Sequence, residues 1–273
     1  MSSDSTLDPL PQVAEAAISE AATSAAETQP DPVPAASEFY APPRVLIIVA
    51  HADDIEFGSA GTVARWTEAG SEVTYCIVTD NGSGSNEPGV KRADLVERRR
   101  REQIAAAEIL GVRDVRFLNY PDGYLEPTLA LRRDLTRIIR EVRPQIVLTM
   151  DPTTTFIDEV GYINHPDHRA VGEAAIHAVF PSAGTRLIFP ELLDEGLEPH
   201  NVSRLYLTVA TKANLIVDVT AVFERKLESL RQHASQLNEE AFEMITRWGA
   251  EEGARHGMGY AESFRVLVMD SNG

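Results

Sequence analysis

The stretch VLIIVAHADDIEFG, residues 45 to 58, places one imidazole and two adjacent carboxylates directly after an apolar run. The run, Val45 to Val49, is typical of a buried strand because it is continuously apolar and rich in β-branched residues. An amphipathic helix is predicted to follow over residues 56–69. The polar residues of this stretch are therefore expected where a strand ends and a helix is about to begin.

The same alternation of strand and helix continues along the chain. Strands are predicted at residues 45–50, 72–79, 115–119, 145–150, 204–209 and 264–269, and residues 214–217 extend or adjoin the fifth of them. Helices are predicted at residues 56–69, 90–110, 129–142, 170–179 and 222–248, the last interrupted near Asn238. This pattern indicates an α/β fold with a mostly parallel sheet covered on both faces. Ligands of such folds bind beyond the carboxyl ends of the strands, where the polar residues of the first stretch lie.

Composition excludes several classes of function. The net charge of −17, from 42 acidic and 25 basic residues, argues against binding to nucleic acid, which needs clustered Lys and Arg. No apolar stretch approaches the roughly 20 residues needed to span a bilayer, so no membrane partner is expected. The start of the chain lacks the features of a secretory signal, and Cys76 is the single cysteine. We therefore expect a cytoplasmic protein.

The first 42 residues differ from the rest of the chain. They are rich in Ala, Pro, Ser and acidic residues and contain almost no large apolar side chain before Phe39. Such a segment buries too little apolar surface to offset the entropy lost on ordering. We predict a disordered tail over residues 1–42 and one folded domain over residues 43–273.

The first polar cluster has the chemistry of a catalytic metal site. His51 and Asp54 lie three residues apart across the bend, close enough to bind one ion, and a mixed imidazole and carboxylate set suits zinc. Asp53 is a spare carboxylate that can take a proton from an attacking water. The alternative is that Asp53 or Asp54 simply caps the following helix, although a cap explains neither His51 nor two adjacent acids.

A second cluster, NHPDH at residues 164–168, supplies what the first lacks. It follows the loop after strand 145–150, so both clusters are expected at one sheet edge. His168 can complete a His/Asp/His set of ligands with the first cluster. His165, steered by Asp167, can donate to a developing oxyanion or protonate a leaving group. The alternative for any one of these histidines is a surface or capping position.

Rival sites on this fold lack their motifs. The glycines at 82, 84 and 89 follow the second strand rather than the first and have the wrong spacing for a dinucleotide fingerprint. The sequence also contains no phosphate-binding loop of the Gly-x-x-x-x-Gly-Lys type and no Gly-x-Ser-x-Gly elbow.

Together the motifs resemble the LmbE/PIG-L family of zinc-dependent N-acetylglucosaminyl deacetylases. The resemblance covers about Val45 to Val268. It rests on AHADDIEFG and NHPDHR, with ERRRREQIAAAEILGV, FLNYPDG and LRQHASQ between and after them. The spacing is most similar to the shorter bacterial branch that includes bacillithiol-pathway deacetylases. The resemblance implies a Rossmann-like three-layer sandwich and hydrolysis of an N-acetyl group on an amino sugar or glycoside.

The resemblance also implies roles for individual residues. The metal, Zn²⁺ with Fe²⁺ as the alternative, would be held by His51, Asp54 and His168. Asp53 would be the general base, and His165 would stabilise the oxyanion or act as acid, tuned by Asp167. Counting from the family's motifs gives Arg99 and Asp122 as ligands of the sugar, although Arg98, Arg100 and Arg101 compete with Arg99 and a solvated helix face is the alternative.

One residue departs from the family pattern. The family usually has proline where this chain has Ala52, and proline would restrict His51 to extended geometry. Alanine is expected to keep the ligands but to loosen the bend.

The sequence therefore predicts a metal-dependent deacetylase acting on a small N-acetylglucosamine-type substrate. A thiol-conjugate amidase using the same metal centre is an alternative, and so is a non-catalytic metal- or sugar-binding relative. Relatives often form trimers or hexamers, so a homo-oligomer is a further expectation of the resemblance.

Overall fold

The computed structural model describes residues 39–157 and 161–269. Most of the predicted tail, residues 1–38, lies outside the described residues. The four residues after it contact the domain: Phe39 stacks on Trp66 with ring centroids 6.3 Å apart, and Trp66 Nε1 donates to the carbonyl of Tyr40 at 3.0 Å. The described part of the chain thus already packs against the domain before the predicted boundary at Pro43.

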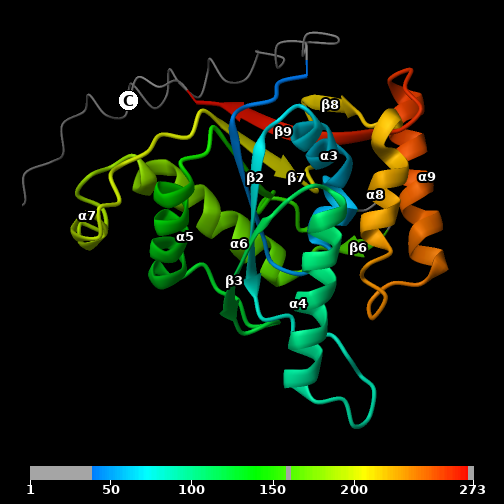
Figure 1. Cartoon of the computed structure of the whole chain (residues 1–273), viewed down its shortest axis with the longest axis horizontal. Coiled ribbons are helices and arrows are strands. Elements are labelled where there is room, and N and C mark those ends of the chain that lie inside the picture. The colour runs from blue at the N-terminus through cyan, green and yellow to red at the C-terminus, as the bar shows by residue number, and fades with distance from the viewer. Residues whose placement is uncertain (1–38, 158–160, 270–273) are drawn as a thin grey trace, which may run out of the picture. The chain divides into compact units, whose positions relative to one another are not determined.

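A seven-stranded sheet forms the centre of the domain (Figure 1). Its strands are β1 (Arg44–Val49), β2 (Glu72–Thr79), β3 (Asp114–Tyr120), β4 (Ile146–Met150), β7 (Arg204–Thr208), β8 (Leu215–Asp218) and β9 (Ala261–Val268). They lie in the order β3-β2-β1-β4-β7-β9-β8. The first five in that order are parallel, whereas β9 runs antiparallel to both β7 and β8. The predicted mostly parallel sheet is confirmed.

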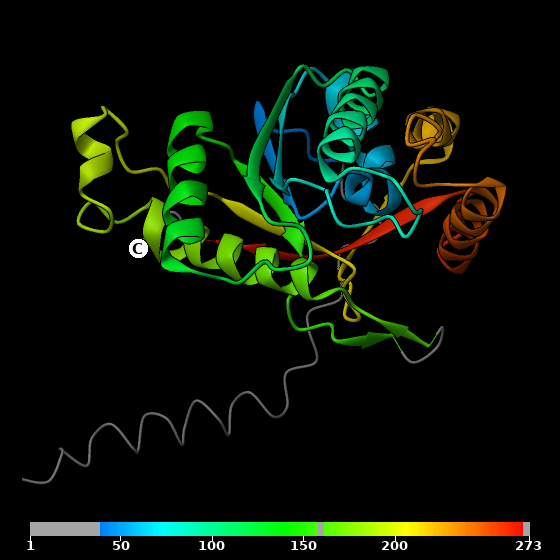
Figure 2. The same cartoon turned by 90° about the horizontal axis from the view of Figure 1, so that it is seen from below.

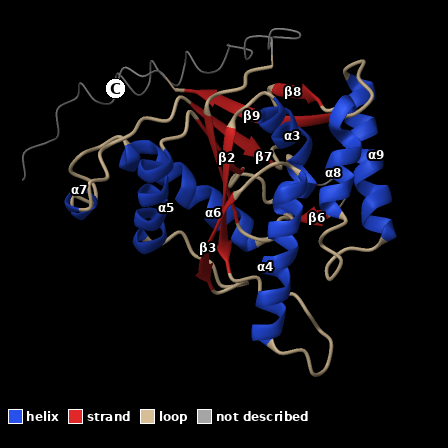
Figure 3. Ribbon diagram, in the orientation of Figure 1, coloured by secondary structure: helices blue, strands red, loops and turns tan. Residues whose placement is uncertain are grey.

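Helices cover both faces of this sheet (Figures 2 and 3). The helices are α2 (Asp54–Gly58), α3 (Ala60–Glu68), α4 (Arg92–Ile109), α5 (Leu129–Val142), α6 (Pro166–His177), α7 (Glu191–Asp194), α8 (Phe223–Leu230) and α9 (Glu239–Arg255), with a π-helical turn at Ala178–Ala183 and a 3₁₀ turn at Thr220–Val222. Helices α5 and α6 pack together and contact β1, while α8 packs against α3 and α4. No described helix is long and apolar enough to cross a membrane, and the cytoplasmic location stays a prediction.

The structure differs from the predicted secondary structure in its short helices and strands. The helix predicted over residues 56–69 is two helices that meet at Ser59, whose φ of −150° and ψ of 4° are not helical. A hairpin of β5 (Phe156–Ile157) and β6 (Tyr162–Ile163) was not predicted. Two-residue strands are too short to show a period.

A buried ion pair ties the end of the chain to its first helices. Glu262 on β9 accepts hydrogen bonds from the backbone N–H groups of Gly61 and Thr62, in the first turn of α3. Lys226 on α8 donates to the same carboxylate at 2.6 Å and to the carbonyl of Phe57 at 3.0 Å. The Lys226 and Glu262 side chains are only 5% and 4% exposed, so each charge depends on the other.

We expect Lys226→Met to lower the free energy of unfolding by about 3 kcal/mol, because Glu262 would keep a buried charge without its partner. Urea denaturation followed by circular dichroism measures the change. Arg186→Ala is the control, since the pair of Arg186 with Glu198 is 61% exposed on both sides and should contribute less than about 1 kcal/mol. Equal losses in the two variants would contradict a special role for the buried pair.

Candidate metal and catalytic centre

The two polar clusters meet at the carboxyl edge of the sheet. Residues 50–53 connect the end of β1 to α2, and residues 164–165 lead into α6. Because β1 and β4 are parallel neighbours and α6 packs against both, the segments that follow the two strands lie side by side. The structure brings AHADD and NHPDH together at one site, as predicted.

Three side chains offer nitrogen and oxygen atoms to a common point. His168 Nε2 lies 3.0 Å from Asp54 Oδ1 and 3.2 Å from His51 Nδ1. One ligand atom from each of the three residues lies within 4.8 Å of the other two. Asn164 orients the second imidazole, because its Oδ1 lies 3.0 Å from His168 Nδ1. Two imidazoles and a carboxylate form a donor set that zinc accepts, and the residues present therefore fit a divalent metal.

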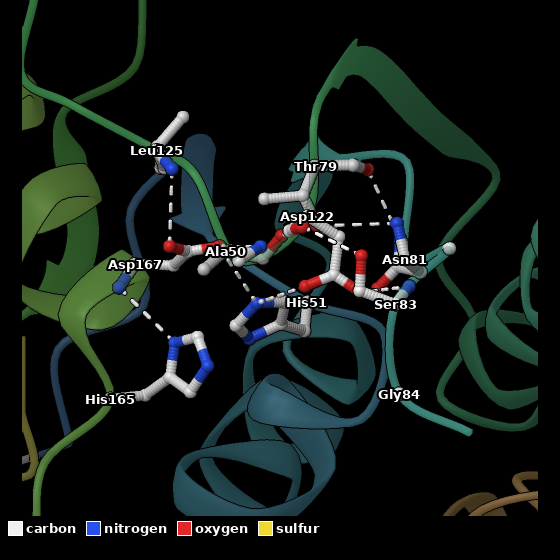
Figure 4. A network of polar contacts seen from close by, with 12 residues as sticks. Ala50, His51, Thr79, Asn81, Ser83, Gly84, Asp122, Leu125, His165 and Asp167 are labelled. Atoms are coloured by element: carbon white, nitrogen blue, oxygen red, sulfur yellow. Dashed lines mark hydrogen bonds and ion pairs between the residues drawn. The ribbon is translucent and has the colours of Figure 1, made fainter. Parts of the chain in front are cut away.

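The other nitrogen of His51 faces two carboxylates (Figure 4). His51 Nε2 lies 3.2 Å from Asp122 Oδ1 and 3.3 Å from Asp167 Oδ2. Burial opposes a charged imidazole, but these two contacts and the charge of Asp54 raise the pKa of His51 to about 10. A carboxylate on the outer nitrogen fixes the tautomer and orientation of a metal-binding histidine. Asp122 and Asp167 thus support His51 from behind.

Asp53 occupies the N-cap position of α2 without capping the helix. Its side chain makes no cap hydrogen bond, and its backbone is left-handed with φ 90°. The Asp54 carboxylate instead accepts from the backbone N–H of His51 at 2.7 Å. Burial and the neighbouring charge of Asp54 raise the pKa of Asp53 to about 8. Helix capping therefore does not account for Asp53, and its carboxylate is poised to exchange a proton near neutral pH.

His165 is held as a hydrogen-bond donor. Its Nδ1 accepts from the backbone N–H of Asp167 at 3.1 Å, so the proton of the neutral ring is on Nε2. Burial and the charge of His51 lower the pKa of His165. The sequence predicted that Asp167 steers this ring. In the structure the backbone of Asp167 does so, while its carboxylate contacts His51 and accepts from the N–H groups of Gly123 and Leu125 (Figure 4).

Side-chain amides hold the loop that carries the first cluster. Asn81, which follows β2, accepts from the N–H of Ala52 at 2.6 Å, and Gln103 on α4 accepts from the N–H of Asp53 at 3.0 Å. Gln236 donates to the carbonyl of Ala52 at 3.3 Å. The expectation that Ala52 loosens the bend stays a prediction, but the Ala52 N–H makes a bond that holds the bend. Proline has no N–H and could not make the bond to Asn81.

The two predicted sugar ligands are buried. Arg99 is 7% exposed, and its guanidinium donates to the carbonyls of Asn81 and Gly84, so that it supports the loop after β2. Asp122 is 5% exposed and accepts from the N–H of Ser83 at 2.8 Å in addition to its contact with His51. In this structure both side chains contact protein atoms, and direct contact with a sugar stays a prediction.

Sequence reasoning missed several residues around the site. Asn81, Gln103, Asn164 and Gln236 bind the backbone or the imidazoles of the two clusters, and Glu56 and His233 lie behind them. Burial and the charges of Asp54 and Asp53 also raise the pKa of the phenol of Tyr162 on β6. Glu56, Gln103, Asn164, His233 and Gln236 lie in quoted motifs, but the distances between these motifs along the chain give no hint of contact.

Comparison with known proteins connects this geometry to a family. The sequence model of the PIG-L family, described as GlcNAc-PI de-N-acetylase, matches residues 46–179, which include both clusters. The chain is 34% identical to the diacetylchitobiose deacetylase of Thermococcus kodakarensis over 228 residues, 82% of this chain and 83% of that protein. It is 30% identical over 207 residues to a probable N-acetyl-alpha-D-glucosaminyl L-malate deacetylase 2 of Bacillus anthracis, covering 71% of this chain and 81% of that one.

A solved structure shares the fold. The N,N'-diacetylchitobiose deacetylase of Pyrococcus horikoshii superposes with a TM-score of 0.78 at 30% identity, over 96% of this chain and 95% of that chain. The expected Rossmann-like three-layer arrangement of this family is confirmed. The narrower expectation of a bacillithiol-pathway branch stays a prediction, because the Thermococcus relative matches a larger share of the chain than the Bacillus one.

We expect Ala52→Pro to destabilise the protein although proline is usual for the family. The substitution removes the donor to Asn81, whose side chain is 2% exposed, and an unpaired buried acceptor costs about 1–3 kcal/mol. Thermal unfolding measures the change, with Ala52→Gly as the control that keeps the N–H. The double variant Ala52→Pro/Asn81→Ala should recover part of the loss. An Ala52→Pro variant as stable as the wild type would contradict the role assigned to this bond.

Proposed function

The chain belongs to the PIG-L family, and from this premise we propose that it hydrolyses the N-acetyl group of a small N-acetylglucosamine-containing sugar or glycoside. The observation that carries the proposal is Asp53, a half-buried acid that directly precedes Asp54 of the ligand set His51, Asp54 and His168. A protein that only bound metal or sugar would have no use for this additional acid. The names of the relatives support an acetylated amino sugar as the substrate.

We further propose that His51, Asp54 and His168 hold a zinc ion, with iron(II) as the alternative. The two imidazoles and the carboxylate support this assignment through their donor types and their mutual distances. When bound, such an ion supplies Lewis-acid polarisation of the acetyl carbonyl. Asp122 and Asp167, on the outer nitrogen of His51, keep that ring turned toward the ion.

The protein side chains perform the proton transfers. Asp53 takes a proton from the water that attacks the acetyl carbon, and a C–O bond forms as the carbonyl oxygen becomes negative. The Nε2–H of His165 donates to this oxyanion. The C–N bond then breaks, the amine leaves with a proton returned from Asp53, and acetate is the second product. The pKa of Asp53, raised to about 8, suits a group that must both accept and return a proton.

The direct test is acetate release from a panel of N-acetylglucosaminides, including N,N'-diacetylchitobiose, by enzyme loaded with zinc or with iron(II). Release of acetate together with a free amine supports the proposal. Absence of acetate from every sugar, with cleavage of a thiol conjugate instead, would replace it with the amidase alternative. The same preparation tests the expected trimer or hexamer by light scattering.

We expect Asp53→Asn to abolish deacetylation while leaving the metal in place. Loss of a general base typically lowers the rate by about 10²–10⁴-fold, and Asn is nearly isosteric with Asp. Acetate release gives the rate, and elemental analysis of the same sample gives the metal content. Wild-type turnover in this variant would remove Asp53 from the role of base.

We expect His168→Ala to lose the metal, because only two of the three protein ligands would remain. Elemental analysis after dialysis measures the occupancy. His177→Ala is the control, since His177 lies on the same helix, α6, and is not among the proposed ligands His51, Asp54 and His168. Full occupancy in His168→Ala would show that the ligand set is wrong.

A further inference from the structure

A buried polar cluster lies behind the loop that carries Asp53 and has no part in the chemistry proposed above. It consists of Glu56 on α2, Gln103 on α4 and His233, which follows α8. All three side chains are fully buried. Three polar side chains from distant parts of the sequence are expensive to bury together unless each has a partner.

The cluster forms a chain of contacts that ends on the backbone of Asp53. Gln103 Oε1 accepts from the N–H of Asp53 at 3.0 Å, and Gln103 Nε2 donates to Glu56 Oε1 at 3.1 Å. Glu56 Oε2 lies 3.2 Å from His233 Nε2. These last two atoms approach without the angle of a good hydrogen bond, so their contact is best described as an ion pair.

The backbone of Asp53 needs such support. Its φ of 90° is a conformation that residues other than glycine rarely adopt, and strain of this kind persists only where the surroundings enforce it. Gln103 is the one described side chain that bonds the Asp53 N–H. The side-chain amide of Gln103 can hold that N–H only while Glu56 accepts from its other end.

We propose that His233 is a positioning residue for Asp53, and that it acts through Glu56 and Gln103. This inference rests on the proposed function, in which Asp53 is the base. A buried Glu56 without a partner on its other oxygen would turn away from Gln103, and it would then no longer fix the orientation of that amide. His233 Nε2, 3.2 Å from Glu56 Oε2, holds the carboxylate in place.

The charges around His233 are consistent with a cation. Burial disfavours the protonated ring, but Glu56 raises the pKa of His233 above its ordinary value, helped by the charges of Asp53 and Glu102. These acids come from α2, from the loop before it and from α4.

The same part of the chain makes one further contact with the loop of residues 50–53 and one with α2, which follows it. Gln236 donates to the carbonyl of Ala52, and Lys226 donates to the carbonyl of Phe57. Residues 226–236 lie outside the segment 46–179 that matches the family model. The catalytic loop is therefore positioned in part by a segment remote from the residues that hold the metal.

The test compares kcat, KM and metal content for His233→Gln and Gln103→Leu with N,N'-diacetylchitobiose as substrate. We expect kcat to fall about 10- to 100-fold, as for a small misplacement of a catalytic group, with KM within about twofold of the wild type and metal content unchanged. In the double variant Glu56→Gln/His233→Gln two neutral amides can hydrogen-bond each other, and Gln103 keeps its acceptor. We expect most of the lost kcat to return.

Ser235→Ala is the matched control. Ser235 lies two residues from His233 and donates to Glu102 at 2.6 Å. Among the described residues it has no hydrogen bond to Glu56, Gln103 or His233, so kcat of the Ser235→Ala variant should equal that of the wild type.

Wild-type kcat in His233→Gln or Gln103→Leu, or a loss of kcat that follows a loss of metal, would overturn the proposal. If His233→Gln does not fold, Gln103→Leu decides. An active Asp53→Asn would instead contradict the base itself, which separates failure of the proposed function from failure of this inference.

Discussion

The structure of the site depends on one constraint, which is that the backbone of residues 50–53 belongs to neither a strand nor a helix and yet is largely buried. Such groups need hydrogen-bond partners. Thr79 supplies two donors to the carbonyl of Ala50, and side-chain amides bind Ala52 and Asp53. Because the partners come from β2, from the loop after it and from α4, the shape of residues 50–53 depends on how these parts pack together.

The charged side chains around His51 interact strongly with one another. Asp54, Asp122 and Asp167 surround His51, and the cost of gathering carboxylates is offset by imidazoles and by backbone N–H groups directed at them. The acids differ in environment, which separates their roles. Asp122 and Asp167 accept several hydrogen bonds, which lower their pKa values, whereas Asp53 accepts none from a side chain and its pKa is raised by burial and by Asp54.

The contrast between predicted and observed features has physical causes. Strand Glu72–Thr79 and helix Leu129–Val142 were predicted to the residue because β-branched content and helical period are local signals. The antiparallel direction of β9 was not predicted, since an apolar strand looks the same in either direction. The contact of Asp122 with His51 was not predicted, and its expected contact with a sugar stays a prediction. The position of Asp122 depends on how far β3 extends beside β2, which no local pattern reveals.

The sequence by itself determined the fold class, the convergence of the two polar clusters and the residue types available for metal and proton chemistry, because these follow from hydrophobic period and from donor chemistry. Only the tertiary structure decided which atoms meet. It placed His51 between His168 and two acids, gave Ala52 the partner that a proline could not have, and brought His233 against Glu56. Such contacts join residues up to about 180 positions apart. They are determined by long-range packing, which local sequence patterns do not reveal.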